Sequence, residues 1–255
     1  MIQLRIFKKF PNLIYGLSTK RDGSMRLIKQ KEKDKKAFKN RQKFLSLFNL
    51  KTKDMVWAFL DHQGRVKIAT SKNRGQWIKN VDGLITKEKN LFLSLTAADC
   101  FPVFFFDQKK EITGLAHASW RAIIKGLITR MIKIMKNKFL SQAKDVLIGI
   151  GPGIRSCHFE VKEDVAKKFL SRFSKKVLIK RKNRLFIDLP MAIKLEAVKN
   201  GILAKNIEEI KECTYCLKNK YFSYRRDKPK QMKTMMALIG LRNVPQGTNP
   251  RFWLK

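Results

Sequence analysis

The chain has 255 residues, of which 44% are hydrophobic, so it is long enough for one substantial core, and we expect a single domain over residues 1–255. No run approaches the roughly eighteen apolar residues of a membrane span, and the first residues lack the apolar core of a signal peptide. We therefore expect a cytoplasmic protein without membrane contact.

The formal net charge is +37, from 57 Lys and Arg against 20 Asp and Glu. Such a basic chain is attracted to polyanions. The basic residues are spread along the sequence, however, and no nucleic-acid-binding module is present. We favour solvated lysines with nonspecific attraction to nucleic acid over physiological nucleic-acid binding.

Apolar residues alternate between strand-like and helix-like spacing in the first half of the chain, which predicts an α/β fold. A helix is expected over residues 35–50. A long helix is expected to begin just after Arg121. Short strands are expected at residues 55–60, 66–69, 91–95, 101–106, 112–116 and 146–151.

The second half of the chain continues the same alternation. Helices are expected at residues 163–173 and 191–200, the latter closed by Gly201. Strands are expected at residues 185–189 and 235–241. Between these strands, residues 224–227 form a basic turn by pattern alone.

Three polar residues, His62, Cys100 and His117, lie at the ends or edges of predicted strands. A catalytic zinc takes three protein ligands from His, Cys or carboxylate and leaves its fourth position to water or substrate. Two of the three histidines of the chain belong to this set. Because the three lack the short spacing of recognisable zinc motifs, a buried thiol with two hydrogen-bonded histidines is the alternative.

The four cysteines, at positions 100, 157, 213 and 216, are few for a disulfide scaffold and fit a reducing compartment. Cys213 and Cys216 form a single C-x-x-C without a second pair. We interpret these two as reduced structural thiols. The sequence assigns no role to Cys157.

The segments around these residues resemble a known family. They are similar to signature blocks of the YfiH-type family, called laccase-like multicopper polyphenol oxidases and, in a newer name, zinc-dependent purine nucleoside phosphorylases. The resemblance extends from about residue 13 to about residue 241. Its blocks are residues 61–66, 95–103, 116–121, 148–154 and 213–214 with 222–227.

The resemblance implies an α/β fold of mixed sheet flanked by helices, and Zn²⁺ bound by His62, Cys100 and His117. It implies phosphorolysis of adenosine, inosine, guanosine and methylthioadenosine to free base and ribose 1-phosphate, with a deaminase activity on adenosine. Purine nucleoside and phosphate would be the partners of a monomer or homodimer. Cys100, His117 and Asp99 are the candidate catalytic residues, with Asp99 either a hydrogen-bond acceptor beside the ligands or a proton carrier.

Five residues are candidates for binding substrate or phosphate. Arg121 stands where a helix is expected to begin, so its guanidinium and free backbone N–H groups would form a phosphate cradle; a surface arginine is the alternative. At least one of two neighbouring arginines is expected to face anionic substrate. The candidates are Lys20, Arg121, Tyr224, Arg225 and Arg226.

The sequence departs from the family pattern at three positions. Ser119 and Ala122 stand where glycines are usual, and side chains there restrict the backbone φ angle. Lys20 replaces an arginine, and a lysine cannot reproduce a bidentate guanidinium contact. We expect these changes to affect the rate and the substrate preference, not the fold.

Other functions remain open at this point. Three histidines are too few for a multicopper centre, so we favour zinc over copper. A cysteine hydrolase with Cys100 as nucleophile and His117 as base is an alternative, because a thiolate serves nucleophilic attack and metal binding alike. A non-catalytic polyanion- or nucleic-acid-binding protein is another, and it would show salt-dependent affinity without nucleoside turnover.

Overall fold

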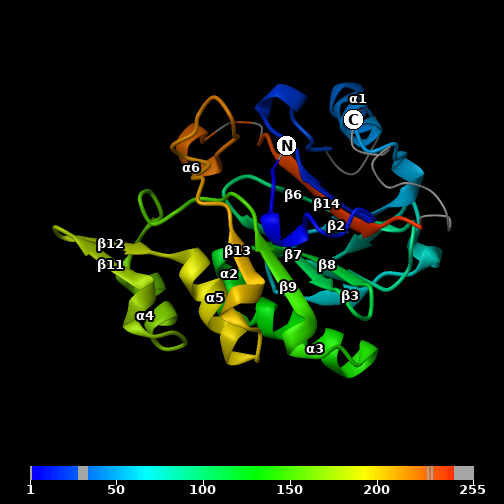
Figure 1. Ribbon diagram of the computed structural model, residues 1–255. Helices are drawn as coiled ribbons and strands as arrows, with labels where there is room; N and C mark the ends of the chain where they lie inside the picture. The colour runs from blue at the N-terminus through cyan, green and yellow to red at the C-terminus, as the bar shows by residue number, and fades with distance from the viewer. Residues whose placement is uncertain (1, 28–33, 229, 231, 244–255) are drawn as a thin grey trace.

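The computed structural model describes residues 2–27, 34–228, 230 and 232–243 (Figure 1). In these residues the strands form three sheets, which helices flank. The α/β class expected from the sequence is confirmed, with the strands divided among three sheets. Within the described ranges, no helix combines the length and the apolar character needed to traverse a bilayer.

The first sheet has five strands, and it includes strands from both ends of the described chain. Its first two strands pair antiparallel, so residues 13–17 lie beside residues 237–241. The remaining pairs are one antiparallel and two parallel. In sheet order the strands are β1 (Leu13–Leu17), β14 (Met235–Leu241), β6 (Phe92–Ala97), β2 (Met55–Phe59) and β4 (Trp77–Lys79).

The second sheet has six strands and is also mixed. Its central strands pair antiparallel, and a parallel strand is added at each edge. In sheet order they are β13 (Ile207–Glu209), β9 (Val146–Ile150), β7 (Phe101–Asp107), β8 (Ile112–Ala118), β5 (Gly83–Thr86) and β3 (Val66–Ile68).

Both faces of the second sheet are buried, which explains the unbroken apolar run of β7. Phe101, Val103 and Phe105 pack with the helices, whereas Phe104 and Phe106 pack with the first sheet. Alternate side chains of a strand point to opposite faces, so a strand covered on both sides is apolar throughout.

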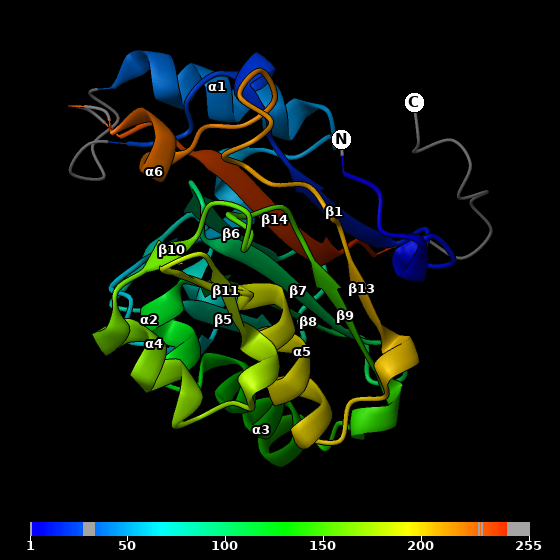
Figure 2. The same ribbon diagram turned by 90° about the vertical axis from the view of Figure 1, so that its left-hand side faces the viewer.

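The molecule is layered, with helices outside the two larger sheets (Figure 2). Helix α1 (Lys35–Ser46) packs on the outer face of the five-stranded sheet through Phe44 and Leu45. On the far face of the six-stranded sheet lie α2 (Trp120–Ile124), α3 (Leu127–Phe139) and α5 (Leu189–Lys199).

The long helix expected after Arg121 is two helices, and the first begins at Trp120, two residues earlier than expected. The break lies at Gly126, which has a φ angle of +82° and therefore cannot continue a right-handed helix. The apolar side chains on both sides keep helical spacing, so periodicity alone did not reveal the break.

The third sheet has three strands and lies beside α4 (Glu163–Leu170) (Figure 1). Near the C-terminal end, residues 224–227 form the short helix α6 (Tyr224–Asp227), where the sequence pattern indicated a turn. The strands of the third sheet, in order, are β10 (Glu160–Val161), β12 (Arg184–Ile187) and β11 (Leu178–Arg181).

Candidate metal and substrate site

His62, Cys100 and His117 come together at one end of the six-stranded sheet. Cys100 directly precedes β7, His117 lies in β8, and His62 lies between β2 and β3. The antiparallel register pairs Pro102 with His117, which places Cys100 beside the end of β8. The ligand atoms of the three side chains all lie within 4.8 Å of one another, so they could hold one metal ion.

Asp82 fixes two of these residues. Its carboxylate accepts hydrogen bonds from the backbone N–H of His62 at 3.0 Å and of Gly64 at 2.6 Å. The same carboxylate lies 3.6 Å from Nδ1 of His117, which directs Nε2 away from Asp82. A carboxylate behind a metal-binding histidine fixes the orientation of its ring. Burial raises the pKa of Asp82, but the nearby His117 and the hydrogen bonds from Gly64 and His62 outweigh this effect and hold the pKa below its usual range, so Asp82 remains ionised.

The surroundings of His117 favour a cation. The side chain is buried, and its Nδ1 has no hydrogen-bond partner in the described part of the chain. Burial lowers the pKa of His117, but the nearby Cys100 and the Asp82 carboxylate raise it to about 9. A positive charge beside Cys100 and the Asp82 carboxylate is thus stabilised, and a divalent metal ion would supply it. Two imidazoles and one thiolate are ligands that suit Zn²⁺.

Asp99 connects this cluster to the C-terminal part of the chain. It has a φ angle of +82°, which is rare for a residue with a side chain. Its carboxylate accepts hydrogen bonds from Oγ1 of Thr214 at 2.6 Å, Oγ of Ser223 at 3.1 Å and the backbone N–H of Arg225 at 2.7 Å. These contacts are those of a hydrogen-bond acceptor that positions the backbone next to Cys100.

A pocket of about 400 Å³ opens over the cluster. Six of the nine candidate site residues named from the sequence line it, while His117 lies behind its wall. Its aromatic and aliphatic walls, with a few charged groups, are typical of small-molecule sites. The lining includes His62, Asp99, Cys100, Trp120, Arg121, Ile154, Phe159, Leu189, Tyr224, Arg225 and Met232.

Comparisons with known proteins identify the family. Residues 14–242 match the model of the family described as multi-copper polyphenol oxidoreductase laccase. The chain belongs to this laccase-like family. The resemblance inferred from the sequence blocks is thereby confirmed.

Relatives and a solved structure of the laccase-like family extend this match. The chain is 30% identical over 84% of its length to the purine nucleoside phosphorylase YlmD of Bacillus subtilis, covering 80% of that protein. It is 28% identical over 71% of its length to the mouse purine nucleoside phosphorylase LACC1, but spans only 42% of that protein. The crystal structure of Bacillus licheniformis YfiH superposes with a TM-score of 0.86 at 28% identity, covering 92% of this chain and 95% of that one.

The two departures from the laccase-like family's glycines cause no strain. Ser119 has a φ angle of −72°, and its Oγ caps helix α2 by accepting a hydrogen bond from the backbone N–H of Ala122 at 3.2 Å. Ala122 is buried in the core. Neither residue needs the left-handed backbone that favours glycine. Arg121 lies inside the first helical turn, with its guanidinium 4.4 Å from the centre of the Trp120 ring.

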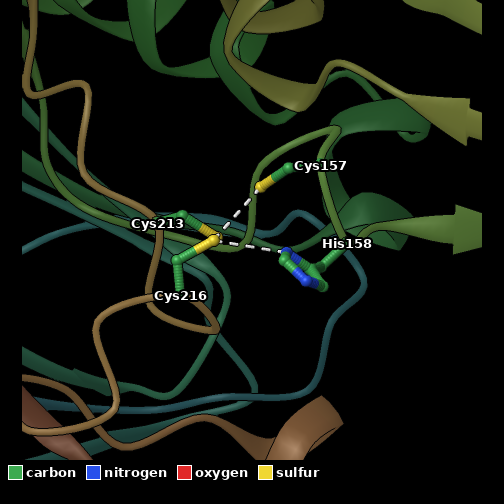
Figure 3. Close-up of side chains that lie close together, drawn as sticks. All are labelled: Cys157, His158, Cys213 and Cys216. Atoms are coloured by element: carbon green, nitrogen blue, oxygen red, sulfur yellow. Dashed lines mark hydrogen bonds between the residues drawn. The ribbon is translucent and has the colours of Figure 1, made fainter.

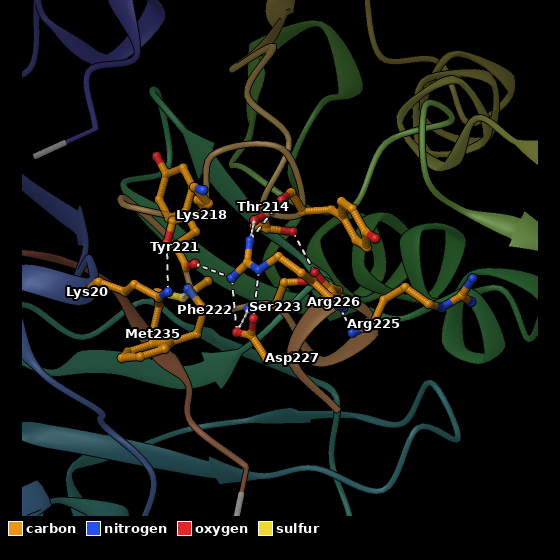
Figure 4. A network of polar contacts seen from close by, with 12 residues as sticks. Lys20, Thr214, Lys218, Tyr221, Phe222, Ser223, Arg225, Arg226, Asp227 and Met235 are labelled. Carbon is orange, nitrogen blue, oxygen red and sulfur yellow. Dashed lines mark hydrogen bonds and ion pairs between the residues drawn. The ribbon is translucent and has the colours of Figure 1, made fainter. Parts of the chain in front are cut away.

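Lys20 does not line the pocket. Its Nζ donates a hydrogen bond to the backbone carbonyl of Lys218 at 2.6 Å and lies 5.5 Å from the centre of the Phe222 ring (Figure 4). The lysine that replaces the family's arginine therefore connects two segments of the chain.

Arg226 is also absent from the pocket lining. Its guanidinium donates to the backbone carbonyls of Thr214 and Tyr215, both at 2.8 Å, and of Tyr221 at 2.9 Å (Figure 4). It also forms two bonds with Asp227, at 2.7 and 2.9 Å. With its donors so engaged, Arg226 holds the loop that precedes α6. Its neighbour Arg225 lines the pocket. The sequence alone does not reveal that these two adjacent arginines have different surroundings.

Arg226→Ala is expected to lower the free energy of unfolding by about 2–3 kcal/mol, because several partly buried carbonyls lose their donor. Urea denaturation measures this loss. Arg225→Ala is the matched control. Its guanidinium donates a hydrogen bond to the carbonyl of Glu160 at 2.9 Å, and a loss below about 1 kcal/mol is expected. Equal losses in the two variants would contradict the structural role of Arg226.

Asp82 is not among the site residues predicted from the sequence. Asp82 acts through backbone N–H groups and through a histidine on another strand, so no short motif contains its partners. The only local signal is an aspartate immediately before a buried strand, which is too common to indicate a site.

Proposed function

We propose that this protein is a zinc-dependent purine nucleoside phosphorylase. The observation that carries the proposal is the three-ligand group of His62, Cys100 and His117 beneath a pocket with aromatic walls and two arginines. A set of three protein ligands leaves a position for water or substrate, as in catalytic zinc sites. The relatives YlmD and LACC1, which are named purine nucleoside phosphorylases, support the same proposal.

The pocket offers separate surfaces for the parts of a nucleoside. Trp120, Phe159 and Tyr224 provide aromatic surface for a flat purine base. Arg121 and Arg225 provide positive charge for phosphate. We propose adenosine, inosine, guanosine and methylthioadenosine as substrates, since each joins a purine to a ribose unit.

In the reaction, a phosphate oxygen forms a bond to ribose C1′ while the bond from C1′ to the purine nitrogen breaks. The bonding electrons leave with the base, which takes up a proton, and ribose 1-phosphate remains. Arg121 and Arg225 position the phosphate, and fixed charges stabilise the transition state without rearranging. Asp99 positions Arg225 by accepting its backbone N–H.

His62, Cys100 and His117 would hold the zinc, and Asp82 would orient His117. When bound, zinc supplies a Lewis acid that polarises an oxygen and lowers the pKa of water. That chemistry also suits removal of the adenosine amino group by water, so we propose adenosine deamination as a second activity of the same pocket.

A cysteine hydrolase remains the second candidate, and one observation favours it. The Sγ atom of Cys100 lies within 4.8 Å of a ring nitrogen of His117. Burial lowers the pKa of the His117 imidazole, but its proximity to Cys100 and Asp82 raises it to about 9. Such a pair is also found where a thiolate is the nucleophile. The two candidates differ in their need for metal and for phosphate.

The test is a chromatographic assay of adenosine and inosine, with and without phosphate, combined with metal analysis. The phosphorylase proposal expects zinc in the protein and the release of base with ribose 1-phosphate only when phosphate is present. Chelation should abolish the activity and added zinc should restore it. Turnover that survives chelation and ignores phosphate would support the hydrolase instead.

Arg121→Ala is expected to raise KM for phosphate about 10- to 100-fold, because a charge-assisted contact of about 1.5–3 kcal/mol is lost. Among the described residues its guanidinium has no carboxylate partner and stays available for an anion. Steady-state kinetics with varied phosphate measure the change. Arg121→Lys should recover part of the affinity.

The matched control for Arg121→Ala is Arg184→Ala, because Arg184 is exposed on β12 and outside the pocket lining. This control should leave both Michaelis constants unchanged. A rise in KM for nucleoside with an unchanged KM for phosphate would contradict the assignment of Arg121.

A further inference from the structure

A second group of metal-binding side chains lies outside the candidate active site (Figure 3). Cys157, His158, Cys213 and Cys216 have their ligand atoms within 4.8 Å of one another. The first two come from the segment between β9 and β10, and the other two from the segment between β13 and α6. The fold therefore supplies the isolated C-x-x-C with the two further ligands that the sequence analysis lacked.

The distances within the group match those around a single ion. Sγ of Cys157 lies 3.6 Å from Sγ of Cys216, which lies 3.3 Å from Nδ1 of His158. Tetrahedral zinc, with Zn–S near 2.3 Å and Zn–N near 2.0 Å, would separate its ligand atoms by about 3.5–3.8 Å. A disulfide requires sulfur atoms about 2.05 Å apart, and all four cysteines of the chain are free thiols.

A backbone N–H group is directed at the sulfur of Cys213. The backbone N–H of Arg155 donates to its Sγ at 3.5 Å. Nearby N–H groups stabilise negative charge on sulfur, which is the form that binds metal.

The histidine of this group is held in place. Its ring stacks on Tyr215, with ring centroids 3.9 Å apart and planes inclined by 15°. Tyr215 itself packs against the main core. His158 therefore directs Nδ1 toward Cys216 before any ion binds, so little side-chain freedom is lost on binding.

We propose that Cys157, His158, Cys213 and Cys216 bind a structural Zn²⁺ ion. Four protein ligands complete a tetrahedron and leave no position for substrate, in contrast to the three-ligand group at Cys100. The two sites therefore have different tasks. This inference concerns a separate site and does not depend on the proposed phosphorylase activity.

The ion would stabilise the contact between two segments that support the substrate pocket. Gly153 and Cys213 form an isolated β-bridge between the two segments. Thr214, next to Cys213, donates the 2.6 Å hydrogen bond to Asp99, which precedes Cys100. A metal ion bound by both segments would keep Thr214 in contact with Asp99. Because Asp99 lines the pocket, the ion would thereby fix part of the pocket wall.

Zinc content of the full-length protein tests the proposal, measured by native mass spectrometry and elemental analysis under reducing conditions. Two zinc ions per wild-type chain are expected. Cys216→Ser should retain one, with Tm lower by about 5 °C or more, because binding to the folded state stabilises it. Cys100→Ser, the matched control, should lose the other zinc, and the double variant should contain none.

Cobalt loading gives an independent readout that needs no activity. Thiolate-to-cobalt absorption should persist in Cys100→Ser, where three thiolates remain, and should fall strongly in Cys216→Ser.

A wild-type chain with two zinc ions supports the proposal even where a variant does not fold. One zinc per chain that Cys216→Ser retains, or a disulfide between Cys157 and Cys216 in the protein purified under reducing conditions, would overturn it. Loss of a single zinc in Cys216→Ser but not in Cys100→Ser would support this site and contradict the proposed catalytic one.

Discussion

Cys100→Ala is expected to lose one zinc ion per chain and at least about a thousandfold in kcat/KM for phosphorolysis. Cys100 is the only cysteine of the three-ligand group, and it lines the pocket together with His62. A catalytic metal contributes several kcal/mol to transition-state stabilisation, and about 4 kcal/mol corresponds to a thousandfold in rate. Elemental analysis and the chromatographic nucleoside assay measure the two losses.

His62→Ala separates this result from loss of a nucleophile. In the metal-dependent reaction His62 is a ligand, so its removal should reduce zinc binding and activity as Cys100→Ala does. In a thiol hydrolase His117 is the base, and His62 has no required task. Full activity in His62→Ala would therefore contradict the zinc proposal. The circular dichroism and Tm of each variant show whether it is folded.

The strands and most helices follow from local patterns. The run 101–106 is apolar because both faces of β7 are covered, and β14 (Met235–Leu241) has the bounds expected from its sequence. Pairing between β1 and β14 joins opposite ends of the chain, and no local pattern contains it. The break at Gly126 was also not predicted, because apolar spacing continues across it.

The candidate site was predictable only in part. Ligand chemistry singled out His62, Cys100 and His117, but their proximity depends on the register of β7 and β8. Arg225 and Arg226 are adjacent and chemically alike, so the sequence could not show that one lines the pocket and the other binds carbonyls. Residue type indicates chemistry, whereas tertiary contacts decide which side chain is free to perform it.

The four-ligand group shows the same limit. Cys157 and His158 are adjacent, and Cys213 and Cys216 lie in one turn, yet neither pair is a metal site alone. Only the contact between the two segments completes four ligands. The oligomeric state, cytoplasmic localisation and nonspecific nucleic-acid attraction stay predictions from composition and resemblance.

Asp82→Ala is expected to weaken zinc binding at the three-ligand group about 10- to 100-fold and to lower the free energy of unfolding by about 2–4 kcal/mol. The substitution removes the carboxylate that orients His117 and leaves two backbone N–H groups, those of His62 and Gly64, without an acceptor. Competition with a chromophoric chelator measures the affinity, and urea unfolding of metal-free protein measures stability.

Asp107→Ala is the matched control for Asp82→Ala. Asp107 is equally buried, and its carboxylate also accepts two backbone N–H groups, those of Lys109 and Lys110, both at 2.9 Å. Asp107 is the last residue of β7, whereas Cys100 directly precedes its first residue, so the two lie at opposite ends of the strand. Loss of the Asp107 carboxylate should therefore destabilise the fold without changing zinc affinity. If both variants lost stability and kept wild-type zinc affinity, Asp82 would be a structural residue only. A loss of zinc affinity confined to Asp82→Ala would show that this buried carboxylate acts on the metal site through His117.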